Sequence, residues 1–496
     1  MSGIFKSRGL IAAVLILVVV IYTFTQYSGV STPAPPSAPP IDSKPVDAKP
    51  PLHNDPPRPG VAVHDAAAAK VTELEAKIKE LQAELTTSHS SQKAEEKEQG
   101  FQKLQGSEEE YFYSPERDRD NHGLTHDQCM AAFPDLYREI DRSAVFWKKR
   151  LGGNITPEHI SLHWSGDGGL RCMIYNQELY IVMSRGLNHF KHWVERSHGT
   201  LHQIHRALIS SPEPVPNIEF SIKINDVIDM PREPSNITLW AFSRNISDPV
   251  MNQTWLIPDF NFWAYPRVAG SFDSFQQQAM EIGSNFTTKK DLLVWRGTID
   301  FNPGIREPLL QQAQGKPWSD VHRVDEDSDE EQMAKMRISM PDHCRYKFAV
   351  HTEGTTWSGR LKYLLSCNSA IFVHKLSWYT HLYHLLEPSG EKQNVVEVDN
   401  EWKELPSKIE DLIEHPAKAK QIADNAAAKF RDRYFTPAAQ TCYWRQLFRV
   451  WREASFEPEP FTYKDAANGP NGTKEKTIRG MSYEEYIFWD KDVPPS

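Results

Sequence analysis

Residues 346–374 read YKFAVHTEGTTWSGRLKYLLSCNSAIFVH, and this stretch decides the fold class. It begins with an apolar strand, Tyr346 to Thr352, which is followed by a turn-rich link over Glu353 to Trp357. A helix is predicted from Ser358, and a second apolar strand over Ala370 to His374. A strand, a turn, a helix and a strand within about thirty residues form a βαβ unit, whose strands run parallel. The sequence therefore predicts an α/β protein.

The turn of this unit has the composition of a phosphate-binding loop. Residues Gly354 to Gly359 supply glycines for close approach and hydroxyls that can cap the helix or donate to phosphate oxygens. Arg360 falls in the first helical turn, where its charge opposes the helix dipole, so an anionic partner would explain it. On this local pattern alone, a surface arginine is an equal alternative. The loop is neither a Walker A loop nor a G-x-G-x-x-G loop.

Other segments extend the alternation of strands and helices. Apolar residues at 218, 220, 222 and 224 alternate with polar ones, which predicts a half-buried strand, and Leu292 to Trp295 predicts another short strand. Three helices are predicted near the end of the body, over residues 407–414, 417–434 and 437–451.

Asp226 is a candidate general base. It follows the apolar positions 218, 220, 222 and 224 at the same spacing of two residues. Its carboxylate is therefore predicted on the buried face, at the end of the strand. Open α/β sheets place their active sites at the carboxyl ends of strands, and partial desolvation there suits a proton acceptor. An aspartate that caps the next turn is the alternative.

The N-terminal region is predicted to deliver the rest of the chain to a membrane. Lys6 and Arg8 precede an uncharged, apolar run over residues 9–26. The positive-inside rule makes this run a transmembrane signal anchor, with residues 1–8 cytosolic and the body lumenal, in the Golgi or endoplasmic reticulum. A cleaved signal peptide is the alternative.

A stem is predicted between the anchor and the body. Residues 27–63 are rich in proline and predict a semi-extended spacer. Residues 64–99 carry five apolar residues spaced 3, 4, 3 and 4 apart. This short a/d seam predicts a weakly dimerising coiled coil, with a lone solvated helix as the alternative. The seam consists of Val71, Leu74, Ile78, Leu81 and Leu85.

Composition and simple motifs exclude several classes of protein. A net charge of −10 disfavours a nucleic-acid partner, and five widely spaced cysteines are too few for a disulfide scaffold or a zinc finger. The acidic run Asp325 to Glu331 contains Asp-x-Asp spacings, but it is predicted to be a solvated loop rather than a metal site. No metalloprotease H-E-x-x-H or hydrolase G-x-S-x-G motif occurs.

Six N-glycosylation sequons support a lumenal body. Three of them fall within residues 236–254, which predicts an exposed, glycosylated loop there. The acceptor asparagines are Asn154, Asn236, Asn245, Asn252, Asn285 and Asn471.

Taken in order, these motifs resemble glycosyltransferase family 90, the group of fungal capsule-associated proteins and Rumi-type protein O-glucosyltransferases. The resemblance runs from about Cys129 to Trp451, and the Pro-rich stem and acidic loop are more similar to the fungal branch. The motifs that carry it are Ile224-Asn-Asp226, Trp295-Arg-Gly297, Asp342 to Phe348, Gly354 to Cys367 and Thr441 to Trp444.

The resemblance implies a GT-B architecture, in which two Rossmann-like domains face a cleft. Residues 110–290 would form the acceptor-side domain, residues 291–455 the nucleotide-sugar-binding domain, and residues 456–496 a C-terminal tail. It also implies disulfides between Cys344 and Cys367 and between Cys129 and Cys442, which leaves Cys172 unpaired.

The resemblance assigns roles to the candidate residues. Asp226 would be the catalytic base, and Thr298 and Arg306 would contact the donor. The family is inverting and its characterised members need no metal, so no cofactor is expected beyond the UDP-sugar co-substrate. The residues expected to cradle the diphosphate are Thr355, Thr356, Trp357, Ser358, Gly359 and Arg360.

The function implied is transfer of xylose or glucose from a UDP-sugar to a glycan or protein hydroxyl. UDP-xylose for glycan xylosylation is expected first and UDP-glucose onto protein serine second, although one hydroxymethyl group alone separates the two donors. The alternative is a non-catalytic carbohydrate-binding scaffold in capsule or wall assembly, which would have no use for both Asp226 and the phosphate-binding residues. The acceptor is expected at residues 248–272, where Trp263 and Tyr265 are candidate stacking platforms.

Overall fold

The computed structural model describes Lys77 and residues 111–232, 236–324, 336–465, 474–489 and 491–494. The chain divides into two compact units, Met1–Ser107 and Glu108–Ser496, and the elements below belong to the second. The predicted anchor, the stem apart from Lys77, the acidic run at 325–331 and Asn471 lie outside the described residues, so the expectations for them stay predictions. No described helix has both the length and the apolar character needed to cross a membrane.

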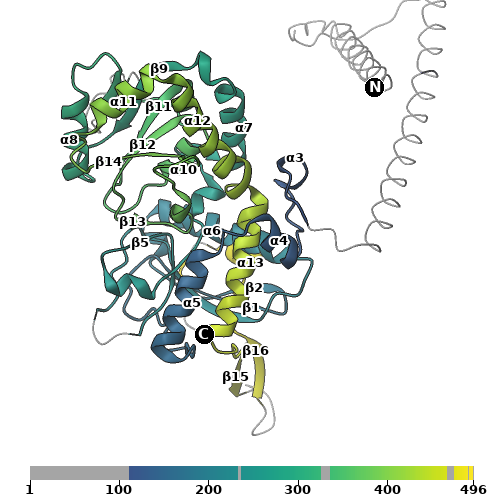
Figure 1. The fold of residues 1–496 in the computed structure, drawn as a ribbon. Coiled ribbons are helices and arrows are strands. Elements are labelled where there is room, and N and C mark those ends of the chain that lie inside the picture. The colour runs from purple at the N-terminus through teal and green to yellow at the C-terminus, as the bar shows by residue number, and fades with distance from the viewer. Residues whose placement is uncertain are drawn as a thin grey trace, which may run out of the picture. The chain divides into compact units, whose positions relative to one another are not determined.

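A five-stranded parallel sheet contains the βαβ unit that the sequence predicts (Figure 1). Strand β11 (Tyr346–His351) pairs in parallel with β12 (Ala370–His374), and α10 (Arg360–Leu365) connects them, starting two residues later than expected. The sheet order is β10-β9-β11-β12-β14, which is 2-1-3-4-5 along the chain, a common doubly wound order. The other three strands are β9 (Lys290–Gly297), β10 (Ser319–Arg323) and β14 (Val396–Val398).

Helices cover both faces of this sheet. Alternate strand residues such as Trp295 and Phe348 pack with α8 (Pro303–Ala313), α11 (Leu405–Glu414) and α12 (Pro416–Ala426). The residues next to these in sequence, Val294 and Ala349, point to the opposite face of the sheet. They belong to a second core cluster, which also includes residues of α7 (Phe272–Gly283) and α10. Burial on both faces explains why these strands read as continuous apolar runs.

A six-stranded mixed sheet forms the other layered part of the body. Its order is β17-β2-β1-β3-β4-β6, with antiparallel pairing from β17 to β3 and parallel pairing from β3 to β6. This differs from the parallel sheet expected of a Rossmann-like N-terminal domain, because Asn176 and Gln177, both with positive φ, join β1 and β2 in a tight hairpin. The strands are β1 (Gly169–Tyr175), β2 (Glu178–Arg185), β3 (Ile218–Lys223), β4 (Trp240–Ala241), β6 (Trp255–Leu256) and β17 (Met481–Ser482).

Strand β3 is buried on both faces, so the prediction of a half-buried strand is wrong. Its polar face is covered, and its charged residues are paired. The Glu219 carboxylate lies between Arg171 and Arg479, 2.6 and 2.8 Å from their guanidinium nitrogens. Lys223 donates to the Ser165 hydroxyl at 2.6 Å. The alternation of apolar and polar residues suggested that one face of the strand meets solvent. Charged side chains can be buried instead when they are paired.

Only part of residues 236–254 is the exposed loop that the three sequons suggested, because Ile246, Ser247 and Pro249 are exposed but most of the segment is not. Thr238 to Ser243 are buried, and Trp240 lies within β4, an interior strand. Trp240 stacks on Phe220 with ring centroids 3.8 Å apart, so this segment belongs to the core. The threonine of the third sequon, Thr254, is fully buried as well.

The predicted C-terminal helices are present. The segment predicted as one helix over 417–434 is α12 followed by a π-helical turn, Ala427–Tyr434. Helix α13 (Pro437–Ala454) packs against α5 (Arg138–Leu151) and α6 (Lys191–Ile209) beside the six-stranded sheet.

Both expected disulfides are confirmed. Cys129 in α4 (His126–Ala132) is bonded to Cys442 in α13, and Cys344 is bonded to Cys367. Cys172 is free and buried.

The remaining elements are short, and two of them, β5 (Arg244–Asn245) and β13 (Trp378–Tyr379), pair with each other between the two large sheets (Figure 1). Met481–Ser482 pairs with β2, so the aromatic part of the tail is ordered against the sheet. The other elements are α3 (Pro115–Asp118), β7 (Ala264–Tyr265), β8 (Gly270–Ser271), β15 (Phe461–Asp465), β16 (Lys474–Ile478) and α14 (Tyr483–Tyr486).

Candidate functional site

The candidate donor site lies where the strand order of the parallel sheet reverses. Strand β9 and strand β11 are neighbours, but the connections that leave them run to opposite sides of the sheet. Ligands of doubly wound sheets bind at the carboxyl ends of such a strand pair. Thr298 directly follows β9, and the loop from Thr352 to Gly359 follows β11, so the structure brings these predicted segments together.

Arg306 joins the two loops at this point. It extends from α8 and is buried, with 7% of its surface exposed. Its Nη1 donates to the Thr298 carbonyl at 2.7 Å, and its Nε donates to the Glu353 carbonyl at 3.2 Å. Its Nη2 would lie 3.6 Å from a Cβ atom at position 354. The glycine at 354 therefore leaves room beside the guanidinium.

Arg360 brings a second positive charge to the same site. Burial, and then the charge of Arg306, lower its pKa to about 10. In the described part of the chain, no carboxylate lies within ion-pair distance of either guanidinium. Arg306 is buried and Arg360 is half-buried. Two neighbouring cations that are withdrawn from water destabilise each other, so the arrangement favours an anionic ligand.

Among the described residues, several buried polar atoms of the predicted donor site lack a hydrogen-bond partner within the protein. They include the hydroxyl oxygens of Thr298 and Thr356 and both ring nitrogens of His351. His351 ends β11, and burial together with the charges of His374, Arg360 and Arg306 holds its pKa well below the usual value. Buried polar groups are normally paired, so this set can hydrogen-bond a polar ligand.

Glu353 fixes the start of the loop. Its Oε1 accepts hydrogen bonds from the backbone N–H groups of Ser377 and Trp378, at 2.9 and 2.7 Å. Its own N–H donates to His374 Nε2 at 3.1 Å. Burial raises the pKa of the Glu353 carboxyl to about 7.

Phe301 adds an aromatic surface to the donor site. Its side chain is 54% exposed, and the Arg306 guanidinium lies 5.9 Å from its ring centroid. The Thr355 hydroxyl donates to the Phe301 carbonyl at 3.5 Å. An exposed ring beside two cations is suited to a flat ligand group attached to an anion.

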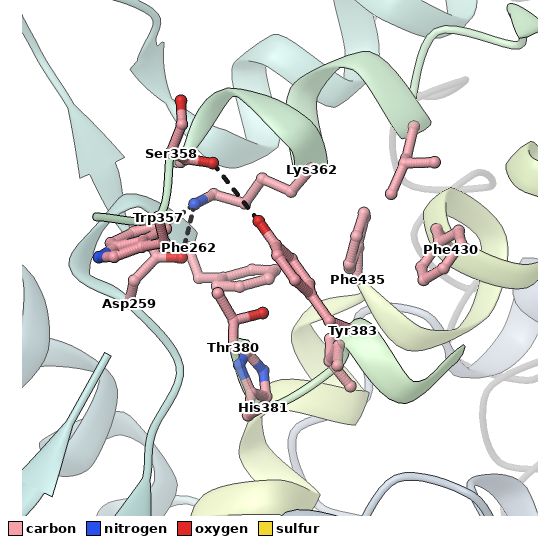
Figure 2. A pocket seen from close by; sticks show the side chains of 13 residues that line it. Asp259, Phe262, Trp357, Ser358, Lys362, Thr380, His381, Tyr383, Phe430 and Phe435 are labelled. Atoms are coloured by element: carbon pink, nitrogen blue, oxygen red, sulfur yellow. Dashed lines mark hydrogen bonds and ion pairs between the residues drawn. The ribbon is translucent and has the colours of Figure 1, made fainter. Parts of the chain in front are cut away.

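The other half of the loop faces a separate small pocket, drawn in Figure 2. Trp357, Ser358 and Gly359 line it together with Asp259 and Lys362. The Lys362 ammonium donates to both carboxylate oxygens of Asp259, at 2.6 and 2.8 Å, and both side chains are buried. The expected cradle is therefore divided, with Thr355 and Arg360 on the side of Arg306.

Gly359 lies close to a neighbouring side chain within the protein. A Cβ atom at this position would lie 2.5 Å from the Asn261 Nδ2 atom. Asn261 belongs to η3 (Phe260–Phe262), which packs against α10 through Asp259 and Lys362. The expected close approach therefore serves packing at this glycine.

Asp226 lies just beyond the carboxyl end of β3. Its side chain is 45% exposed, and both its oxygens accept from the Arg196 guanidinium, at 2.9 and 3.1 Å. Arg196 extends from α6, and its guanidinium lies 5.1 Å from the Phe260 ring centroid. Each carboxylate oxygen keeps a lone pair for a further donor.

A short chain of contacts connects Asp226 with the loop that precedes Arg360. Arg196 contacts Phe260, and the neighbours of Phe260 in sequence contact Lys362 and Gly359. No ion pair joins Asp226 to Arg360, although both are among the described residues. The base candidate and the cationic site therefore belong to different sheets that meet through η3.

No group of three or more His, Cys, Asp or Glu side chains is arranged to hold a metal ion within the described ranges. The Asp-x-Asp run at 325–331 lies outside those ranges, so the expectation of metal independence remains a prediction.

Comparison with known proteins identifies the family. A family model for glycosyl transferase family 90 matches residues 127–458, about two thirds of the chain. The chain belongs to glycosyl transferase family 90.

The chain is also similar to several curated proteins. It is 29% identical over 116 residues to protein O-glucosyltransferase 2 of Danio rerio, covering 23% of this chain and 22% of the relative. It is 25% identical over 255 residues to an O-glucosyltransferase rumi homolog of Aedes aegypti, covering 47% and 61%. It is 23% identical over 257 residues to protein O-glucosyltransferase 1 of Homo sapiens, covering 47% and 62%. The chain thus spans between about a fifth and three fifths of the length of these relatives.

Several site residues of this family member were not found by sequence reasoning. His351 is the last residue of a predicted strand, and its position at the carboxyl end was the available signal. Phe301 follows the Arg-Gly motif closely but lies in a segment with no clear periodicity. Arg196 and Asp259 act through tertiary contacts with Asp226 and Lys362, which no local pattern reveals.

Proposed function

We propose that the chain is a membrane-anchored, inverting glycosyltransferase that moves a sugar from a UDP-sugar to a hydroxyl of a glycan or protein. The observation that carries this proposal is the pair formed by the buried Arg306 and the half-buried Arg360, at the reversal point of a parallel sheet. Among the described residues, neither guanidinium has a carboxylate within ion-pair distance. A departing diphosphate gains negative charge in the transition state. Fixed positive groups that meet this charge lower the barrier without reorganising.

In this proposal the two sheets supply the two halves of a GT-B fold. The five-stranded sheet would hold the nucleotide-sugar at the ends of β9 and β11, with Phe301 beside the arginines. The six-stranded sheet would supply the acceptor side, with Asp226 at the end of β3. The contacts of η3 with Arg196 and Lys362 support a fixed placement of one half against the other.

Asp226 would act as the general base. It would remove the proton from an acceptor hydroxyl while the hydroxyl oxygen attacks the anomeric carbon from the face opposite UDP. The bond between the anomeric carbon and the diphosphate oxygen breaks, and its electron pair leaves with UDP. Arg196 would hold the carboxylate in one orientation through its two hydrogen bonds.

The donor sugar and the location are also proposed. The relatives are named O-glucosyltransferases, which supports UDP-glucose, whereas the resemblance to the fungal branch supports UDP-xylose. The apolar run at 9–26 supports anchoring in the Golgi or endoplasmic reticulum membrane, with the body in the lumen.

The proposal is tested with the purified full chain in detergent. UDP release is measured with UDP-xylose, UDP-glucose, UDP-galactose and UDP-glucuronate, with and without a chelator, and UDP binding is measured by calorimetry. Binding of UDP together with release from one donor supports the proposal. A protein that binds no UDP contradicts it and favours a carbohydrate-binding scaffold.

A further inference from the structure

An exposed aromatic cluster lies at the start of α6 and takes no part in the donor site. It consists of Phe190, His192 and Trp193, and we refer to it as the α6 aromatic cluster. The Phe190 ring meets Trp193 edge-on with centroids 4.7 Å apart and stacks on His192 at 5.5 Å. Phe190 is 53% exposed. Apolar surface that remains exposed in a cluster commonly marks a binding site.

The α6 aromatic cluster is adjacent to Asp226. Arg196 lies one helical turn after His192 and Trp193 on α6, and its guanidinium binds both Asp226 oxygens. The charges of Arg196 and Asp226 both act on the His192 ring, whose pKa is lowered mainly by burial. Val227, the residue after Asp226, is 43% exposed. The cluster and the base candidate therefore share one surface.

Polar groups border the aromatic rings. Glu195 of α6 accepts from Arg267 at 3.3 Å, and both side chains retain exposed surface. Asn188, His189 and Lys191 are exposed on the segment that carries the cluster. Rings surrounded by hydrogen-bonding side chains offer both an apolar face and polar contacts at its edge.

The ring that the sequence suggested as a stacking platform is occupied within the protein. The Trp263 ring lies 4.9 Å from His202, and the Arg206 guanidinium lies 4.8 Å from its centroid. Tyr265 packs edge-on against Phe260 at 5.4 Å. The rings beside Asp226 are therefore the better candidates for contact with an acceptor.

We propose that the α6 aromatic cluster is an acceptor subsite that binds the ring of a carbohydrate. This proposal rests on the proposed function, because it takes Asp226 as the base for the acceptor hydroxyl. A pyranose presents C–H groups on its face, which pack on an aromatic ring, and hydroxyls at its edge, which suit the polar border. A peptide acceptor is the alternative occupant, and the peptide probe in the experiment below tests it.

The experiment uses saturation-transfer NMR with the full chain. The probes are the methyl glycosides of mannose, galactose, glucose and xylose, together with a serine-containing peptide, each with and without UDP. Phe190→Ala removes a ring that is 53% exposed, and Phe190→Trp keeps an aromatic surface. Phe112→Ala is the matched control, because Phe112 is 72% exposed outside the cluster.

We expect at least one glycoside to bind, and Phe190→Ala to weaken it about fivefold or more. Phe190→Trp and Phe112→Ala should bind it like the wild-type chain, and UDP affinity should be unchanged in all variants. Equal glycoside affinity in Phe190→Ala, binding of the peptide alone, or binding of no probe would overturn the subsite. If the wild-type chain does not bind UDP, the proposed function is refuted. Failure of the subsite and failure of the proposed function therefore give different results.

Discussion

The buried Arg306 and the half-buried Arg360 bring two guanidinium groups to one site, and burial together with the charge of Arg306 lowers the pKa of Arg360 to about 10. Arg306 is held by the carbonyls of Thr298 and Glu353, so it is fixed by the loops that follow two neighbouring strands. Neighbouring like charges that are withdrawn from water cost stability unless an anion joins them. The site at the carboxyl ends of β9 and β11 is therefore suited to a ligand that carries phosphate.

Asp226→Asn should lower transferase turnover by about 10² to 10⁴, because one positioned base contributes that factor. The amide keeps the shape and can still accept from Arg196, so UDP affinity should stay within about twofold of wild type. The measurement is UDP release under saturating donor. Asp229→Asn, an exposed carboxylate three residues further on, is the control and should retain activity. Full activity in Asp226→Asn would show that another group removes the proton.

Lys362→Met should destabilise the protein by about 3 to 5 kcal/mol, because it leaves the buried carboxylate of Asp259 unpaired. Adding Asp259→Asn should recover part of this loss, since the uncompensated charge is then gone. Chemical denaturation followed by Trp fluorescence measures both variants. Lys418→Met breaks an exposed pair with Asp411 and should cost less than about 1 kcal/mol. Equal effects of Lys362→Met and Lys418→Met would refute the structural role of the buried pair.

Glu353 should make stability depend on pH. Burial raises its folded pKa from 4.5 to about 7, so the folded protein holds a proton that the unfolded chain has lost between these values. The free energy of unfolding should therefore fall as pH rises from about 4.5 to about 7, by on the order of 2 to 3 kcal/mol.

Glu353→Gln should remove this slope, because its side-chain oxygen can still accept from Ser377 and Trp378. Thermal unfolding at several pH values measures the difference between the two proteins. The exposed Glu414→Gln is the control and should follow the wild-type curve. Parallel curves for Glu353→Gln and wild type would mean that the carboxyl is ionised throughout this range.

Local patterns in the sequence were sufficient to predict a parallel sheet and the loop that follows its strand β11. The βαβ unit at 346–374 depends on contacts within thirty residues, so apolar runs and a turn reveal it. The antiparallel hairpin of β1 and β2 was missed because its turn, Asn176-Gln177, lacks the glycine that usually marks such turns. Sequons at 236–254 suggested exposure, yet Trp240 stacks in the core there, because sequon spacing carries no information about burial.

The assembled site was only partly predictable. The two-residue spacing of apolar positions predicted Asp226 at the end of its strand, and the composition of the loop predicted that Arg360 binds an anion. The partners of these residues are distant in sequence: Arg196 lies 30 residues before Asp226, and Asp259 lies 103 residues before Lys362. Such pairs form only when helices and sheets pack, so a pattern read along the chain does not contain them.

The most direct test compares the binding of UDP and uridine by calorimetry in the wild-type chain and in Arg360→Ala. The account predicts that wild type binds UDP at least about tenfold more tightly than uridine, and that Arg360→Ala loses most of this difference while it still binds uridine. Equal affinity of the wild-type chain for UDP and uridine would contradict the claim that Arg306 and Arg360 form the diphosphate site.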